Sequence, residues 1–93
     1  MGNQVIIIGV DESNNVERLF LEFHAGREII AFLMKDKEIQ YDILQEYIDI
    51  VEAKYVELEL MKSELSEKYK PFNMKEYDYR FDFRNNSIIY NEM

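Results

Sequence analysis

Several residue types that support catalysis, metal binding or covalent cross-linking are scarce in this chain of 93 residues. It has no cysteine, which excludes disulfides, thiolate metal ligands and cysteine nucleophiles. His24 is the only histidine, so any histidine-based catalytic or metal site would have to use it. Because such sites need several converging groups, we interpret His24 as a polar surface residue. We expect no enzymatic activity, no cofactor and no bound metal.

Basic residues are also few, since 11 lysines and arginines stand against 19 aspartates and glutamates, for a net charge of −8. Binding to a phosphate backbone or to an anionic membrane draws its affinity from clustered positive charge. We therefore expect neither direct nucleic-acid binding nor membrane binding. The same charge attracts a basic protein over long range, so we expect a basic protein partner.

Long apolar runs are missing as well. The longest, residues 29–34, is far too short to span a membrane, and the first residues lack the basic region of a signal peptide. Together with the absence of cysteine, this favours a cytoplasmic protein, or one of the host cytoplasm if the chain is viral. The length predicts a single domain, residues 1–93.

The most informative feature that is present is a long amphipathic helix, predicted over Tyr41–Tyr69 and ended by Pro71, the only proline. Its apolar residues recur every three or four positions and resemble a heptad, which implies a partner helix. The simplest partner is a second copy, so we expect a homodimer. The alternative is a helix bent near residues 57–59 with both halves on one sheet. The expected interface residues are Leu44, Ile48, Val51, Tyr55, Leu58 and Leu65.

The opposite side of this helix carries a row of carboxylates, called here the acidic stripe: Asp42, Glu46, Asp49, Glu57, Glu64 and Glu67. At 100° per residue they fall within about 80° of the helix circumference. Neighbouring like charges at this spacing cost roughly 0.2–0.5 kcal/mol per pair, and only Glu64 with Lys68 has the favourable order. An ordinary solvated face is the alternative. We predict that the stripe binds the partner.

Three strands are predicted before the helix. Residues 4–10 are short and β-branched, and residues 18–24 alternate between apolar and polar side chains. Residues 28–34 complete an antiparallel meander, with turns at residues 11–15 and 25–26. The alternative for the third segment is a helix over residues 27–35.

A β-hairpin is predicted after the helix. Residues 76–84 alternate strictly, with Tyr77, Tyr79, Phe81 and Phe83 on one face. Residues 85–87 form the turn, because asparagine tolerates positive φ, and residues 88–90 return. We expect the aromatic face to pack on the apolar side of the long helix. The predicted fold is therefore α+β in the order β-β-β-α-β-β.

A small, acidic chain without cysteine or a catalytic constellation is similar to phage-encoded inhibitors, including anti-CRISPR and other anti-defence proteins. That resemblance implies a stoichiometric inhibitor of a basic nucleic-acid-handling or defence protein, which can act by imitating nucleic acid. One alternative is a homo-oligomeric assembly module. Another is a protein that sequesters a small anionic ligand at a dimer interface, through Arg18, Arg27, Arg80 and Arg84.

Overall fold

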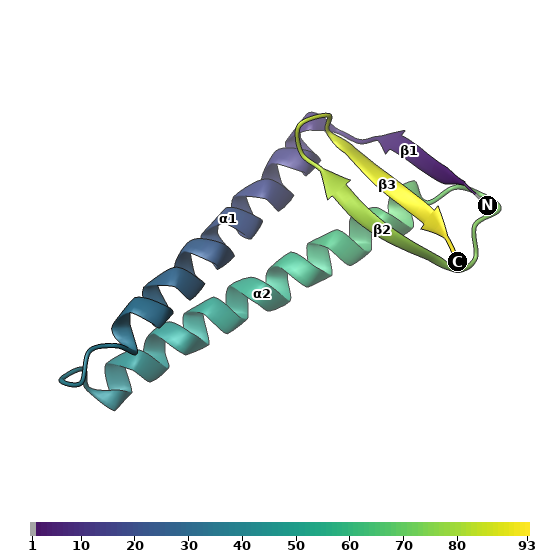
Figure 1. Cartoon of the computed structure of the whole chain (residues 1–93). Coiled ribbons are helices and arrows are strands. Elements are labelled where there is room, and N and C mark those ends of the chain that lie inside the picture. The colour runs from purple at the N-terminus through teal and green to yellow at the C-terminus, as the bar shows by residue number, and fades with distance from the viewer. Residues whose placement is uncertain (1) are drawn as a thin grey trace.

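The computed structural model describes residues 2–93, and it consists of a long helical hairpin joined at one end to a three-stranded sheet (Figure 1). The sheet is antiparallel, and its third strand lies between the other two. This confirms the predicted α+β class. The elements in chain order are β1 (Asn3–Ile7), α1 (Val10–Leu33), α2 (Tyr41–Tyr69), β2 (Tyr77–Asp82) and β3 (Ser87–Glu92).

The predictions for the second half of the chain are confirmed in the type and order of the elements, but β2 ends at Asp82 rather than at residue 84, and Ser87, predicted in the turn, begins β3. Helix α2 has the predicted bounds, and Lys70 leaves the helical conformation directly before Pro71. In the β2–β3 turn, Asn86 has a φ of 48°, as a turn asparagine tolerates. The Asp82 carboxylate accepts a hydrogen bond of 2.8 Å from the side-chain amide of Asn85 and longer ones from the backbone of Asn85 and Arg84, and these bonds hold its pKa below the ordinary value.

The prediction for the first half was wrong in two of its three strands. Residues 18–24 and 28–34 belong to one continuous helix, α1, which also includes the predicted turns at residues 11–15 and 25–26. The alternative of a helix over residues 27–35 was the better interpretation of that segment. The order of elements is therefore β-α-α-β-β rather than β-β-β-α-β-β.

Helix α1 forms because its inward-facing positions follow a helical period. Ser13, Val16 and Leu19 are buried, and the next positions in the series are half-buried: Phe23, Gly26, Ile30 and Leu33. Steps of three and four residues place all seven on one side of a helix. The alternation that suggested a strand was misleading, because Leu19 is fully buried whereas Leu21 is 58% exposed.

The two helices pack side by side and antiparallel, as in an antiparallel coiled coil (Figure 1). Gly26 lies close against α2, and a Cβ atom at this position would come within 2.6 Å of Cγ2 of Val51. The rings of Phe23 and Tyr55 are 5.3 Å apart, and Lys54 Nζ lies 2.5 Å from a carboxylate oxygen of Glu22. The partner helix implied by the heptad of α2 is thus in the same chain.

The main core lies where the sheet covers one end of the helical hairpin. Ile88 and Tyr90 of the central strand are fully buried, and the Tyr90 hydroxyl donates a hydrogen bond of 2.7 Å to the carbonyl of Ser66 in α2. Burial raises the pKa of Tyr90 far above its ordinary value. The aromatic side chains predicted to face the helix do pack against this core: Tyr77, Tyr79, Phe81 and Phe83.

One carboxylate joins the start of α1 to the end of α2. Glu12 accepts hydrogen bonds from the backbone N–H of Gly9 at 3.1 Å, from Lys68 Nζ at 2.7 Å and from the hydroxyl of Tyr69. Bonds to Lys68 and Tyr69 lower the pKa of Glu12, and Glu12 in turn raises the pKa of Lys68. Glu12 therefore both caps α1 and fixes the open ends of the two helices together.

Beyond the sheet, the two helices continue unaccompanied. The molecule measures 54 × 25 × 17 Å, and its radius of gyration of 16.8 Å exceeds the roughly 12 Å of a compact chain of this length. Figure 1 shows the helices projecting away from the strands. We call this projecting part, residues 21–57, the arm. The long helix therefore extends well past the globular part of the molecule.

We predict that Glu12→Ala lowers the free energy of unfolding by about 1–2 kcal/mol, because it removes a helix cap and two side-chain bonds. Since the pKa of Glu12 is lowered in the folded state, its contribution is complete above the ordinary pKa near 4.5 and is lost as the pH falls through the lowered value. Urea unfolding at pH 7 and pH 3 checks this. If Glu12→Ala lowers the free energy of unfolding by as much at pH 3 as at pH 7, the charge-based explanation is wrong.

We predict that Gly26→Ala destabilises the protein despite the better helix propensity of alanine. The added methyl meets the stiff, buried Val51, and overpacking of this kind costs about 1–3 kcal/mol against a gain of about 1 kcal/mol. In a Val51→Ala background the same substitution should stabilise. Urea unfolding of the four proteins in this double-mutant cycle measures the coupling, and equal effects in both backgrounds contradict the proposed contact.

Candidate functional site

The acidic stripe is fully on the surface: all six of its carboxylates are exposed along α2. Val51, Leu58 and Leu65, which are buried, mark the side of α2 that faces α1 and the sheet. Helical geometry places the centre of the stripe about 140° away from that side. From Asp42 to Glu67 the stripe runs for about 38 Å along the helix. It is therefore open to a partner along its whole length.

Nearly all of this negative charge is left unneutralised. Over residues 2–93, Glu67 is the only stripe carboxylate with an ion pair, a contact of 3.4 Å to Lys70. Lysines of α2 contact carboxylates outside the stripe: Lys54 pairs with Glu22, Lys62 with Glu59 and Lys68 with Glu12. The favourable pair expected between Glu64 and Lys68 is absent from these contacts, because Lys68 reaches across to α1 instead.

Two stripe carboxylates accept neutral hydrogen bonds. Asp49 accepts one of 2.9 Å from Nε2 of Gln45, and Glu67 accepts one of 3.1 Å from the hydroxyl of Tyr77. These bonds orient the carboxylates and leave their charge in place, since neither donor is ionised. Two of the stripe carboxylates are thus held in place, while the negative charge of the stripe is not neutralised.

The six residues expected at a homodimer interface lie on the side of α2 that is occupied within the chain. Val51, Leu58 and Leu65 are buried, and Leu44 and Ile48 are half-buried. Tyr55 remains 48% exposed beside the ring of Phe23. The heptad on which the dimer prediction rested therefore has its partner helix in α1. The homodimer itself stays a prediction.

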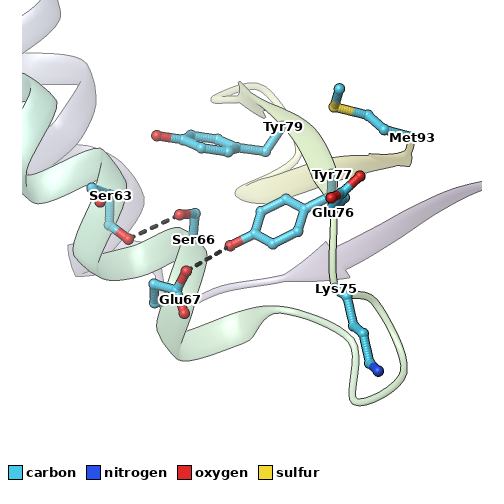
Figure 2. Close-up of a pocket in the computed structure, with 8 residues that line it drawn as sticks. All are labelled: Ser63, Ser66, Glu67, Lys75, Glu76, Tyr77, Tyr79 and Met93. Carbon is cyan, nitrogen blue, oxygen red and sulfur yellow. Dashed lines mark hydrogen bonds between the residues drawn. The ribbon is translucent and has the colours of Figure 1, made fainter.

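A surface groove of about 550 Å³ lies between the end of α2 and the start of β2 (Figure 2). Its wall contains the Tyr77–Glu67 hydrogen bond and one from the Ser66 hydroxyl to the carbonyl of Ser63. The groove is open to solvent, and in Figure 2 the side chains of Lys75 and Met93 point away from the Tyr77–Glu67 pair. The lining residues are Ser63, Ser66, Glu67, Lys75, Glu76, Tyr77, Tyr79 and Met93.

A smaller cleft of about 240 Å³ lies between the helices and β2. It is mostly apolar and aromatic, yet two of its residues are cationic, Lys62 and Arg80. Of the four arginines considered for an anionic ligand, only Arg80 lines this cleft. Arg18 pairs with Glu22 at 3.1 Å, and the Arg27 guanidinium lies over the ring of Phe23. The structure does not bring the four arginines together.

Metal and imidazole chemistry find little support in the part of the chain that the structure describes. It contains no group of three or more histidine, cysteine, aspartate or glutamate residues placed to hold a metal ion. His24 is exposed on α1, with its ring 4.4 Å from that of Phe20 and 5.6 Å from that of Phe23. Its neighbours are thus aromatic.

The structure reveals a second surface that the sequence reasoning missed. The exposed apolar side chains of the arm include three on α1 and three on α2 that recur at helical spacing: Leu21, Ile29, Phe32, Ile43, Tyr47 and Ile50. In the sequence, these residues form a second apolar series at helical spacing, beside the series that faces the other helix. It was hidden because residues 18–34 were interpreted as strands.

Comparisons with models of known protein families, with curated proteins and with solved structures find no match to this chain. Within residues 2–93, neither helix combines the length and apolar character that crossing a bilayer requires.

We predict that Glu46→Lys stabilises the protein by about 0.5–1 kcal/mol. The substitution replaces two repulsive neighbours, Asp42 and Asp49, by two favourable pairs at helical spacing. Urea unfolding at low salt is the measurement, because an ionic denaturant would screen the effect. Ala53→Lys, which places a lysine four residues from both Asp49 and Glu57 without removing a carboxylate, is the comparison, and the difference between the two variants measures the repulsion that Glu46 contributes. A loss of stability in Glu46→Lys contradicts the assignment of the stripe as strained by its own charge.

Proposed function

We propose that this chain is a binding protein whose acidic stripe contacts a basic surface of a partner protein. The partner is a nucleic-acid-handling or defence protein of the cytoplasm, and the chain acts as its stoichiometric inhibitor. The single observation that carries the proposal is the pattern of ion pairs. Five stripe carboxylates have none in the described chain, whereas three lysines of the same helix pair with carboxylates elsewhere.

This arrangement of unpaired carboxylates lowers the stability of α2 and produces a negative electrostatic potential along its exposed side. Like charges along one helix side repel one another, and helices of this length commonly offset such repulsion with lysines on the same side. Here the repulsion is retained over about 38 Å of exposed surface. A basic partner removes the repulsion when it binds, so part of the cost is recovered in the complex.

The stripe resembles duplex DNA in sign more than in charge density. Six charges over about 38 Å correspond to roughly one charge per 6–7 Å, against one per about 1.7 Å in the duplex. A groove built for nucleic acid therefore accepts the stripe through a few matched lysines or arginines. Inhibition follows by competition, because a groove occupied by α2 has no room for nucleic acid.

A second candidate function rests on the smaller cleft. Lys62 and Arg80 are placed in an apolar cleft of a protein with a net charge of −8, a combination suited to a small anion with an apolar body. Such a ligand would raise the melting temperature in proportion to its affinity. Thermal shifts with aromatic and aliphatic carboxylates, compared with Arg80→Gln, test this candidate.

The main proposal is tested by capture from a nuclease-treated bacterial lysate, with quantitative mass spectrometry at low and high salt. We expect the wild type to retain one basic nucleic-acid-handling protein at 0.1 M salt and to release it at 1 M, where the screening length falls from about 10 Å to about 3 Å. The variant Glu46→Lys/Asp49→Lys/Glu57→Lys should lose it by at least tenfold. The purified partner should then be inhibited at a one-to-one ratio.

A matched control separates the stripe from net charge. Glu38→Lys/Asp78→Lys/Glu92→Lys changes the net charge equally, at exposed carboxylates without ion pairs in the described chain and outside the stripe. This variant should retain the partner. Equal loss in both variants would reduce the effect to overall charge, and retention by the stripe variant contradicts the proposal.

A further inference from the structure

The second surface of the arm has the properties of a docking site. Its six side chains, called here the arm patch, are between 43% and 75% exposed: Leu21, Ile29, Phe32, Ile43, Tyr47 and Ile50. With about half of the roughly 150–200 Å² of each side chain in contact with water, the patch presents on the order of 500–600 Å² of apolar surface. That is at the upper end for a monomeric protein. It also provides most of the roughly 800 Å² per partner of a specific interface.

The patch is continuous across the two helices. The Glu22–Lys54 ion pair joins the flanks of α1 and α2 on one side of the line where Gly26 meets Val51. Counting at 100° per residue, Ile29 on α1 and Ile50 on α2 are both rotated from the contact line toward that same flank. The antiparallel pairing brings them to the same level of the arm.

The remaining members extend this surface along the arm. Phe32 follows Ile29 by three residues, and Leu21 lies about 20° from Phe32 around α1. On α2, Tyr47 and Ile43 precede Ile50 by three and seven residues. Residues at these intervals are neighbours on one side of a helix. The patch thus forms an apolar surface on one flank of the arm that continues round to the outer side of α1, and Figure 1 shows that no strand covers this part of the molecule.

The acidic stripe borders the patch directly. On α2, Glu46 and Glu57 lie within about 60° of Ile50 around the helix axis, on the side away from α1. A ligand seated on the patch therefore has an apolar surface beneath it and carboxylates along one edge. This arrangement determines the chemistry that fits it.

We propose that the arm patch docks an amphipathic helix of the partner, with an apolar ridge for the patch and lysines or arginines along the edge that meets the acidic stripe. The inference rests on the proposed function and adds the form of the partner's binding element. Helices bind in this way through apolar anchors at intervals of three and four residues. Tyr47 and Phe32 provide aromatic anchors near the centre and the tip.

Charge selects this occupant over a second copy of the chain. Two copies paired through the arm patch would bring two acidic stripes to the rim of one interface, in a protein that already carries a net charge of −8. Like charges at an interface rim are repulsive, whereas a basic helix makes the same rim attractive. The patch and the stripe therefore complement one ligand.

The test uses a three-heptad fluorescein-labelled peptide with leucine at the a and d positions and lysine or arginine beside them, measured by fluorescence anisotropy. The full-length protein should bind it, with affinity that falls as salt rises. The variant Phe32→Gln/Ile50→Gln should bind at least tenfold more weakly. Two matched peptides, one with serine for leucine and one with glutamate for the basic residues, should not bind.

Val56→Gln is the matched protein control. Val56 is on the same helix as Ile50 and is similarly exposed, at 64% against 57%, but it points to a different side of α2. It should bind the peptide as the wild type does. Circular dichroism of each variant confirms that the helices are retained, so that a loss of binding reports on the surface.

Three outcomes overturn the inference. They are failure of the wild type to bind the basic peptide at 100 µM, equal binding by Phe32→Gln/Ile50→Gln, and a wild-type dimer in light scattering that this variant dissociates. If the partner captured from lysate is lost with the stripe variant but kept with Phe32→Gln/Ile50→Gln, the docking inference fails and the proposed function stands. If the stripe variant also keeps it, both fail.

Discussion

The contact between α1 and α2 at Gly26 and Val51 is the constraint on which the rest of the structure depends. A helix of 29 residues is too long for a domain of this size to cover, and a second helix packed along it supplies the missing apolar surface. A side chain at position 26 would separate the helices, because Val51 is stiff and buried. The ion pair of Glu22 with Lys54 and the hydrogen bonds of Glu12 then determine how the pair is aligned.

That alignment also decides the surface charge. When α1 packs against α2, Glu12 and Glu22 come within reach of Lys68 and Lys54, so cations that could neutralise the acidic stripe are bound on the other side of the helix. These ion pairs connect the two helices, and the stripe is left without the lysines that would neutralise it. The same packing turns two apolar rows outward on the arm, since neither helix is covered on both flanks beyond the sheet.

In the proposed binding mode, the acidic stripe and the arm patch contribute at different stages. Exposed carboxylates act over the screening length and govern encounter with a basic partner, while an apolar patch contributes chiefly after contact, when water is expelled. A partner that meets both requirements is selected more strictly than one that meets either. The sheet takes no direct part in this scheme and serves to hold the open end of the hairpin.

The sequence by itself determined the elements whose signals are local. The bounds of α2 follow from its period and from Pro71, and the β2–β3 hairpin follows from strict alternation and a turn asparagine. The position of the acidic stripe on one side of α2 follows from the spacing of its carboxylates at 100° per residue. Only the tertiary structure decided the identity of residues 18–34, because a segment with apolar residues at both two- and three-residue intervals is compatible with strand or helix until a partner surface selects one. It likewise decided that the heptad of α2 is satisfied within the chain, and which lysines reach which carboxylates, since those pairs join residues far apart in sequence.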